Sequence, residues 1–237
     1  MISIIIPALN EERYIGRILN ALKNQTFRDF EVILVDAHSE DNTRAIAKQY
    51  DFVKLVNSKT RNVSYQRDLG VTRASFRRIV FMDADGYMKP LFLEKAMKEI
   101  KKRKIIVGAC YLYPDSSSLF YKLVFFIFRQ WIRFISAVDS PKINGAALFS
   151  TKEMHEKIGG FNQKITFTED YDYGHRASKY CDVKFLRTKM YTSVRRFETE
   201  GKLRMALRYL WMGIYITLFG NPKPGTFNYK FGHYKFL

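Results

Sequence analysis

Two aspartates with one residue between them follow an apolar run in the first half of the chain. Asp83 and Asp85 come directly after the segment RIVFM at residues 78–82. Carboxylate oxygens at this spacing can hold a hard divalent cation, which also takes phosphate oxygens as ligands. An acidic turn is the simpler alternative, because aspartate is common in turns. The position of the pair at the end of a strand-like segment favours the cation site.

Two further groups of carboxylates could take part in chemistry. Asp36 closes the apolar segment EVILVD, where its carboxylate could accept an N–H group of a nucleobase. Glu169 and Asp170 lie in the segment TEDYD at residues 168–172. A carboxylate beside a reacting carbon can remove the proton of a hydroxyl group. Acids at the start of a helix also stabilise that helix without any further role, so both interpretations of this cluster stay open.

Arginines are the candidate contacts for phosphate groups, because the guanidinium fork can bind phosphate through two hydrogen bonds. The chain has 40 Lys and Arg residues against 23 Asp and Glu residues, which gives a net charge of +17. Most of these cations must lie on the surface, and a surplus of this size favours anionic partners. The arginines that we single out are Arg61, Arg67, Arg195 and Arg196.

Several enzyme classes are disfavoured by the motifs that the sequence lacks. It has no GxxxxGK[ST], GxGxxG or GxSxG segment, which argues against P-loop ATPases, dinucleotide-binding enzymes and serine hydrolases. The 4 histidines show no spacing typical of metal ligands, and we expect them to be structural. Cys110 and Cys181 are the only cysteines, so there is no disulfide framework, which fits a reducing compartment.

The elements around these residues predict an α/β fold with a mostly parallel sheet. Strand-like apolar segments alternate with helical ones and lie at residues 2–7, 31–36, 52–57 and 78–83. Strands without polar alternation indicate a parallel sheet that is covered on both faces. Ligands bind beyond the carboxyl ends of such strands, where Glu11, Asp36 and Asp83 would all lie. Asn10 is the expected cap of a helix that begins at Glu11.

The second half of the sequence is less regular. It predicts a short strand at residues 183–186 and two helices, at 119–137 and 200–219, that combine aromatic and aliphatic residues with Lys and Arg. No repeat and no linker-like stretch is present. We therefore predict one domain over residues 1–200, followed by a C-terminal amphipathic helix and an irregular tail over residues 201–237.

The two aromatic and basic helices raise the question of membrane contact. Their longest apolar stretches, at residues 123–128 and 209–220, fall short of the about 18–20 uncharged residues of a spanning helix. The N-terminus lacks the pattern of a signal peptide. Amphipathic helices flanked by Lys and Arg suit the headgroup plane of an acidic membrane, and a core helix with a basic edge is the alternative. We expect a cytoplasmic protein, which under the first interpretation contacts the cytoplasmic face of the membrane peripherally.

Taken in order, these segments resemble family 2 glycosyltransferases of the GT-A fold. The matching segments are IIIPALNEE from residue 4, EVILVDAHSEDNT from residue 31, YQRDLG from residue 65, IVFMDADG from residue 79, and residues 144–176 with NGAALF, GGFNQ and TEDYDYGHR. The ordered set carries the likeness, over residues 1–200. It implies a Rossmann-like, mostly parallel sheet flanked by helices, and an inverting hexosyltransferase that uses a UDP- or GDP-linked sugar.

The resemblance also implies roles for residues on the donor side. Pro7, Leu9 and Glu11 would lie against the nucleoside, with Glu11 on the ribose. Asp36 would contact the base, and Arg67 would lie near the nucleotide phosphates or the metal-site acids. Ala37 departs from the family pattern, because a second aspartate is common at that position. Asp68 departs as well, since asparagine often follows the arginine.

The remaining roles concern the metal, the base and the acceptor. Asp83 and Asp85 match the DxD motif, and Asp85 would be the direct ligand of Mg²⁺ or Mn²⁺ on the diphosphate. Asp170 matches the catalytic base, which would deprotonate the hydroxyl group of a glycan or of a polyprenyl-linked acceptor. Three residues would lie near the acceptor or a phosphate, namely Glu169, Arg195 and Arg196.

Two other functions compete with this interpretation. A glycosyltransferase-like protein without activity would share the same motifs. A basic nucleic-acid-binding protein would explain the charge and the interleaved aromatic residues. The second leaves the carboxylates at the strand ends unexplained, because acids in a cleft repel phosphate unless a metal intervenes. We therefore expect no nucleic-acid partner.

Overall fold

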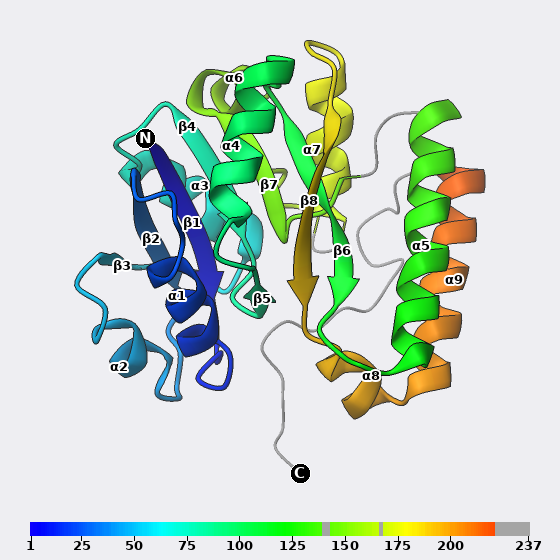
Figure 1. Cartoon of the computed structure of the whole chain (residues 1–237), viewed down its shortest axis with the longest axis horizontal. Coiled ribbons are helices and arrows are strands. Elements are labelled where there is room, and N and C mark those ends of the chain that lie inside the picture. Colours follow the sequence, from blue (N-terminus) through cyan, green and yellow to red (C-terminus); the bar gives the residue numbers. More distant parts are fainter. Residues whose placement is uncertain (139–142, 166–167, 221–237) are drawn as a thin grey trace.

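The computed structural model describes residues 1–138, 143–165 and 168–220. In these ranges an eight-stranded sheet crosses the molecule, with helices on both of its faces (Figure 1). The strands are β1 (Ile2–Ala8), β2 (Phe30–Asp36), β3 (Val53–Asn57), β4 (Arg78–Met82), β5 (Gly86–Tyr87), β6 (Gly108–Pro114), β7 (Ala147–Thr151) and β8 (Lys184–Thr192). The helices are α1 (Ile15–Lys23), α2 (Thr43–Ala47), α3 (Val63–Arg73), α4 (Phe92–Arg103), α5 (Leu119–Val138), α6 (Lys152–Lys157), α7 (Glu169–Ser178), α8 (Arg195–Glu200) and α9 (Lys202–Phe219).

The sheet is mixed and mostly parallel, which confirms the predicted α/β class. Its strand order is β3-β2-β1-β4-β7-β6-β8-β5. β1 pairs in parallel with β2 and β4, β2 with β3, and β6 with β8. β7 runs antiparallel to both β4 and β6, and β5 runs antiparallel to β8. The carboxyl ends of β1, β2 and β4 therefore meet at one edge, as the sequence predicts.

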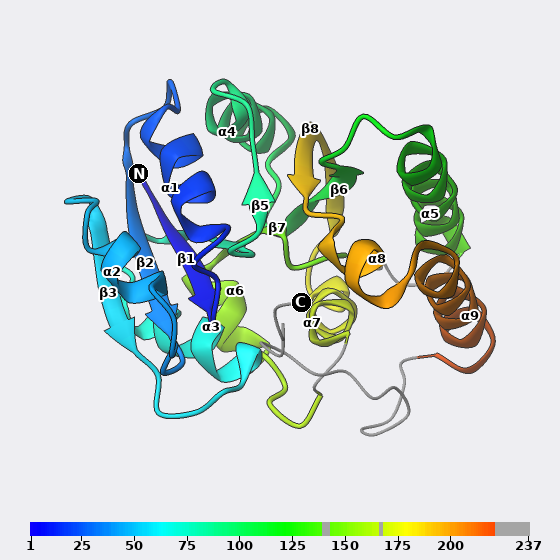
Figure 2. The ribbon, with the colours of Figure 1, turned by 90° about the horizontal axis from the view of Figure 1, so that it is seen from below.

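Two hydrophobic cores lie on opposite faces of the sheet. β1 is buried along its whole length, because successive side chains of a strand point to opposite faces and both faces are covered. Ile4 packs into the core that contains residues of α1 and α4, whereas Ile5 packs into the core formed with α3, α6 and α7. Figure 2 shows these two groups of helices on either side of the strands. Packing on both faces of the sheet therefore fixes the positions of the strand ends.

The predicted start of the first helix is wrong by about one turn. α1 begins at Ile15, and Asn10 has a φ of 55°, a left-handed conformation that does not cap the helix. The residues between them form a turn in which the Tyr14 N–H donates to the Glu11 carbonyl over 2.9 Å. The backbone thus leaves Glu11 in the loop after β1 instead of in a helix.

Three elements in the second half of the sheet and after it were missed or only partly predicted, because they are short or polar. β8 extends over Lys184–Thr192, well beyond the predicted residues 183–186, because it pairs with β6 through an irregular register at Cys110 and Tyr111. β5 and α8 were not predicted.

The C-terminal helix is present as α9, which packs beside α5 at one end of the molecule (Figures 1 and 2). The tail predicted at residues 221–237 lies outside the described residues. Across residues 1–138, 143–165 and 168–220, we find no helix that combines the length and the apolar character needed to cross a bilayer.

Candidate active site

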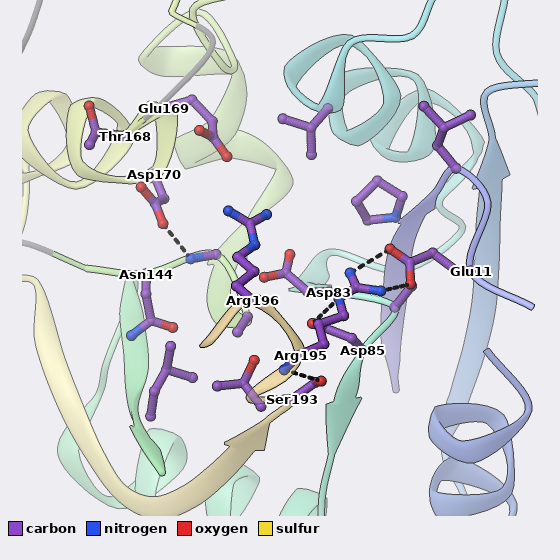
Figure 3. A pocket seen from close by; sticks show the side chains of 18 of the residues that line it. Glu11, Asp83, Asp85, Asn144, Thr168, Glu169, Asp170, Ser193, Arg195 and Arg196 are labelled. Atoms are coloured by element: carbon purple, nitrogen blue, oxygen red, sulfur yellow. Dashed lines mark hydrogen bonds and ion pairs between the residues drawn. The ribbon is translucent and has the colours of Figure 1, made fainter. Parts of the chain in front are cut away.

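A pocket of about 300 Å³ opens at the carboxyl edge of β1 and β4. Its wall also includes residues from the start of α7 and from the β8–α8 connection. Figure 3 shows acidic side chains of α7 on one side and Glu11 on the other, with Arg195 and Arg196 extending between them. Most of the residues singled out from the sequence line this pocket: Pro7, Leu9, Glu11, Arg61, Arg67, Asp83, Asp85, Glu169, Asp170, Arg195 and Arg196.

The loop after β1 is held in place by the loop after β2. The Glu11 N–H donates to the Thr43 hydroxyl over 2.7 Å, and the Asn10 N–H donates to the Ser39 hydroxyl over 3.0 Å. A third bond runs from the Glu12 N–H to Asp41 Oδ2 over 3.0 Å. Sequence patterns suggest only turn and capping roles for the residues after β2. Their contacts show that they also fix the position of Glu11.

Asp36 is the predicted site residue that the structure does not bring together with the others. It lies at the end of β2 but is fully buried and is not part of the pocket wall. Its carboxylate accepts hydrogen bonds from the Ser39 hydroxyl and, over 3.1 Å, from the Ser39 N–H. These bonds form the turn that places Ser39 against Asn10. In this structure the Asp36 carboxylate therefore faces its own loop, and its contact with a nucleobase stays a prediction.

Arg67 connects α3 to two acids of the pocket. Its Nη2 lies 2.9 Å from Asp83 Oδ1, and its Nη1 lies 2.6 Å from Glu169 Oε1. The neighbouring acids raise the pKa of this buried guanidinium, although burial opposes them. A Cβ atom at Gly145 would lie 2.3 Å from Arg67 Nη2, so a larger residue here would displace the guanidinium from its present position. This contact explains the glycine of the segment NGAALF.

Arg195 neutralises two acids on the opposite side of the pocket. Its Nη1 and Nη2 donate to the two carboxylate oxygens of Glu11 over 2.6 and 2.8 Å. Its Nε lies 3.3 Å from Asp85 Oδ2. Burial raises the pKa of both carboxyl groups, and the charge of Arg195 opposes that shift. Arg195 is thus the cation that the structure places between the expected ribose contact and the expected metal ligand.

Asp170 is held at the start of α7 with one oxygen on each of two backbone N–H groups. Oδ2 accepts from the Gly145 N–H over 2.7 Å, and Oδ1 accepts from the Tyr171 N–H over 2.9 Å. The nearby Thr168 has a φ of 66°, which only a constrained turn gives to a threonine. Burial, together with the charge of Glu169, raises the pKa of Asp170 to about 8. A carboxyl group with such a pKa is suited to exchange a proton near neutral pH.

Asp83 and Asp85 can contribute oxygen ligands to a divalent cation. Both line the pocket, and carboxylates are the hard ligands that Mg²⁺ and Mn²⁺ prefer. In the described part of the chain, no group of three or more His, Cys, Asp or Glu side chains could hold a metal. Mg²⁺ is often bound by one or two carboxylates, with water and substrate phosphates completing its coordination. The two aspartates therefore fit a cation that is shared with a diphosphate.

The far end of the pocket is apolar, and the sequence patterns did not reveal this. Val124, Phe125 and Phe128 of α5 form part of this wall together with Tyr209 and Met212 of α9. The reason is tertiary, because these two groups of residues, far apart in the sequence, meet only once the two helices pack. The signal in the sequence was the apolar character of both helices, which fits a core, a membrane or a ligand equally well.

Asn144 also lines the pocket, and the sequence analysis did not single it out. Its Nδ2 donates to the Cys110 carbonyl over 2.9 Å, which orients the carboxamide in the pocket wall. Among the described residues, its buried Oδ1 has no hydrogen-bond partner. A buried carbonyl oxygen of this kind costs free energy unless a ligand or water donates to it. Its place directly before Gly145 was the only signal in the sequence.

The contacts of Asp68 explain why the chain departs from the family pattern at this position. It lies outside the pocket wall, where Oδ1 accepts from the Phe161 N–H over 2.9 Å and lies 3.3 Å from His155 Nε2. Both partners follow β7 in the chain, so Asp68 connects α3 to that segment. This position is structural, and the expectation that His155 has a structural role agrees with its buried place in the core around Phe81.

Comparison of the sequence with known families identifies the match to be expected from these motifs. The profile of the family described as Glycosyl transferase family 2 matches residues 3–165. Among curated proteins, glycosyltransferase AglE of Haloferax volcanii is 28% identical over 187 residues, which cover 75% of this chain and 61% of AglE. The uncharacterized glycosyltransferase EpsJ of Bacillus subtilis is 27% identical over 121 residues, covering 49% of this chain and 35% of EpsJ. The chain thus spans between about a third and three fifths of these two relatives.

Solved structures share the fold. Mannosyltransferase PcManGT from Pyrobaculum calidifontis, in complex with GDP-Man and Mn²⁺, superposes with a TM-score of 0.68 at 20% identity, covering 94% of this chain and 65% of that one. TarS of S. aureus, residues 1–349 in complex with UDP-GlcNAc, gives a TM-score of 0.66 at 18% identity, covering 90% of this chain and 66% of that one. At this level of identity, the likeness shows a common GT-A architecture.

Proposed function

Because this chain belongs to glycosyl transferase family 2, we propose that it transfers a sugar from a nucleoside-diphosphate sugar to an acceptor, with inversion at the anomeric carbon. One observation carries the proposal. Asp83 and Asp85 at the end of β4 line the same pocket as the half-buried Asp170, whose pKa is raised to about 8. A charge-binding pair and a proton acceptor in one pocket are what such a transfer requires. We assign the transfer to residues 1–200 and treat residues 201–237 as a C-terminal extension.

The donor side of the pocket is assigned to the loop after β1 and to the arginines. Pro7 and Leu9 would lie against the nucleoside, and Glu11 would accept hydrogen bonds from the ribose. Glu11 is paired with Arg195 in the structure. When the donor binds, the ribose hydroxyl groups must therefore replace part of the contact between Arg195 and Glu11. A diphosphate offers Arg195 a stronger partner than one carboxylate does. We therefore assign Arg195 to the donor phosphates, with Arg196 beside it.

The acids after β4 and the buried arginine organise the departing group. Asp83 and Asp85 would hold Mg²⁺ or Mn²⁺, which when bound supplies positive charge to the diphosphate as it leaves. The structural relative that holds GDP-Man and Mn²⁺ supports this assignment. Arg67 fixes the orientation of Asp83 through their 2.9 Å contact. Through its hydrogen bonds with Ser39, Asp36 fixes the loop after β2, and the base would lie against that loop.

Asp170 is assigned as the general base. It takes the proton of the acceptor hydroxyl group while the acceptor oxygen bonds to the anomeric carbon, on the face opposite the diphosphate. The bond between that carbon and the diphosphate oxygen breaks, and its electron pair leaves with the nucleoside diphosphate. No covalent sugar–enzyme intermediate is needed, so a second nucleophilic carboxylate is not required. Glu169 stays paired with Arg67 and sets the local charge.

The acceptor would enter from the apolar end of the pocket. The aromatic and aliphatic side chains of α5 and α9 there suit a hydroxyl group carried by a lipid, such as a polyprenyl-linked glycan. A hydrophilic glycan could use the same end only through its polar edges. The predicted cytoplasmic location, at the face of a membrane, belongs to this proposal.

The pKa of Asp170 predicts how the transfer rate depends on pH. A general base works only when it is deprotonated, and burial raises the pKa of Asp170 to about 8. We expect kcat/KM for a hydroxyl acceptor to rise about tenfold per pH unit below that pKa and to level off above it. Rates measured between pH 5.5 and 9.5 with the donor in excess check this. A profile that is already flat from pH 5.5 would show that Asp170 is not the titrating base.

The experiment that tests the proposed function follows the donor by proton NMR. The chain is incubated with a panel of α-linked UDP- and GDP-sugars, Mn²⁺ and alkyl-linked glycan acceptors. We expect one donor to be consumed and the new glycosidic bond to carry the opposite anomeric configuration. A product with retained configuration would contradict the inverting mechanism. Failure of every donor would favour a glycosyltransferase-like protein without activity, and a nucleic-acid-binding protein would also consume none.

A further inference from the structure

The outer sides of α5 and α9 expose large apolar side chains in regular stripes. The spacing of these residues is three, four, seven or eight positions, so each set lies along one side of its helix. Two of them, Leu119 and Trp211, are 81% and 57% exposed. We call these residues the α5–α9 surface: Leu119, Leu123, Phe126, Ile127 and Phe134 of α5, and Leu203, Leu207, Leu210, Trp211, Ile214 and Leu218 of α9.

The opposite sides of the same helices are already buried. Tyr121 of α5 and Met205 of α9 belong to one apolar cluster, and Met212 and Ile216 of α9 belong to another with Tyr171. Each helix is therefore apolar on two opposite sides. One side is buried against the protein, and the other is exposed to water. A contiguous apolar patch of this kind marks an interaction site. The two helices lie side by side at one end of the molecule (Figures 1 and 2).

The charges on the two helices identify the chemistry of what covers them. Neither α5 nor α9 contains an Asp or Glu residue. Both carry exposed cations, among them Lys122 and Arg133 on α5 and Lys202 and Arg204 on α9. Long basic side chains beside an apolar stripe can reach the headgroups while their stems stay in apolar surroundings. Apolar stripes, a tryptophan and cations without acids are the composition of a helix that lies in an anionic lipid interface.

The α5–α9 surface lies on the helices that also form part of the pocket wall. The inner sides of α5 and α9 form the apolar wall of the pocket, through Phe125, Phe128, Tyr209 and Met212. The same two helices thus face the pocket on one side and solvent on the other. A bilayer in contact with the outer side would lie close to the pocket's apolar end.

We propose that the α5–α9 surface docks on an anionic membrane and holds the apolar end of the pocket at the lipid interface. The helices lie in the plane of the headgroups, since neither could span the bilayer. A lipid-linked acceptor could then reach Asp170 while its tail remains in the membrane; this part rests on the proposed function. The docking itself depends only on the exposed side chains and their charges.

Sedimentation of the full chain with lipid vesicles tests the proposal. We expect binding to vesicles of 70% phosphatidylcholine and 30% phosphatidylglycerol at low salt. Binding should weaken at least tenfold at 0.5 M salt or on pure phosphatidylcholine, because salt screens the attraction between cations and anionic lipid. Lys122→Gln and Lys202→Gln should each weaken it by about fivefold. Equal binding to neutral and anionic vesicles, or none to either, would overturn the proposal.

Apolar variants test which surface is used. Leu207→Glu and Trp211→Glu should each lower vesicle affinity by at least about tenfold, since each removes a buried apolar side chain from the interface. Leu91→Glu is the matched control, because it changes the net charge equally at an exposed leucine outside this surface. Circular dichroism melts verify that all three variants are folded. If Leu207→Glu binds vesicles as tightly as Leu91→Glu does, the surface is wrongly assigned.

Two further measurements separate this proposal from its competitors. Analytical ultracentrifugation that finds a dimer broken by Trp211→Glu, with no vesicle binding, would identify a second copy as the occupant and overturn the membrane assignment. Asp170→Asn should bind vesicles like the unchanged chain, because docking does not use the catalytic carboxylate. For this variant, loss of transfer with intact docking is what both proposals predict. In the unchanged chain, docking without any transfer would contradict the proposed function alone, and transfer without docking would contradict the membrane proposal alone.

Discussion

Replacing Asp170 by Asn is expected to lower kcat for transfer to a hydroxyl acceptor by about 100- to 10,000-fold, the range that a general base contributes. Asparagine keeps the size of the side chain and one oxygen, which can accept from one of the two backbone N–H groups, of Gly145 and Tyr171, that donate to Asp170. It cannot take a proton from the acceptor. The donor is held elsewhere in the pocket, so its dissociation constant should change by no more than about twofold.

Asp172→Asn is the matched control for this change. Asp172 belongs to the same first turn of α7 but pairs with Arg176 over 2.7 Å and is not part of the pocket wall. We expect it to retain nearly full activity, because the Asp172 carboxylate does not line the pocket, and a thermal melt measures the stability lost with its ion pair. If Asp170→Asn transfers sugar as fast as Asp172→Asn does, Asp170 is not the base.

The part of the site that could be predicted from the sequence is the part set by the sheet. Apolar strands end at residues whose polarity is visible in the sequence, and parallel strands end at a common edge. Glu11 and Asp83 could therefore be placed together from the sequence alone. The same reasoning did not foresee the surroundings of Asp36, because a carboxylate at a strand end can also turn back onto its own loop. Its hydrogen bonds from Ser39, three residues later, show that arrangement.

The contacts of the arginines could not be predicted in the same way. Arg195 and Glu11 are 184 residues apart, and among 40 basic residues no local pattern distinguishes the one that meets a given acid. The pairing depends on where β8 ends, and β8 was underestimated because Lys, Arg and Thr interrupt its apolar residues. Strand pairing with β6 compensates for that polarity.

The apolar wall illustrates a third limit. Both helices that form it were predicted from their periodicity, close to their observed bounds. Their composition could not show which side of each helix would be buried, because both sides are apolar. Packing of Tyr121 against Phe197 and of Met212 near Tyr171 settles this. The outer side then becomes visible as a surface.

Replacing Asp85 by Asn is the second change with a large expected effect. It removes the carboxylate that we assign to the divalent cation, and it takes from Arg195 one of its acidic partners. We expect kcat/KM for the donor to fall by about 100- to 1000-fold, as when one group that stabilises developing charge is removed. Measured affinity for the nucleoside diphosphate should also cease to depend on Mn²⁺.

Asp115→Asn serves as the control for Asp85→Asn. Asp115 is likewise paired with an arginine, Arg17, and it is not part of the pocket wall. Its replacement should leave both kcat/KM and the effect of Mn²⁺ unchanged. A drop in kcat/KM for Asp115→Asn equal to that of Asp85→Asn would show that loss of an ion pair, and not loss of a ligand, causes the effect.

We propose above all that the aspartates after β4 and the loop after β1 form a binding site for a nucleoside diphosphate. Calorimetric titration of UDP and of GDP into the unchanged chain, with and without Mn²⁺, measures this directly. We predict that one of the two nucleotides binds with 1:1 stoichiometry and that Mn²⁺ strengthens its binding at least tenfold. No binding of either nucleotide in the presence of Mn²⁺, or equal binding with and without it, would contradict the account.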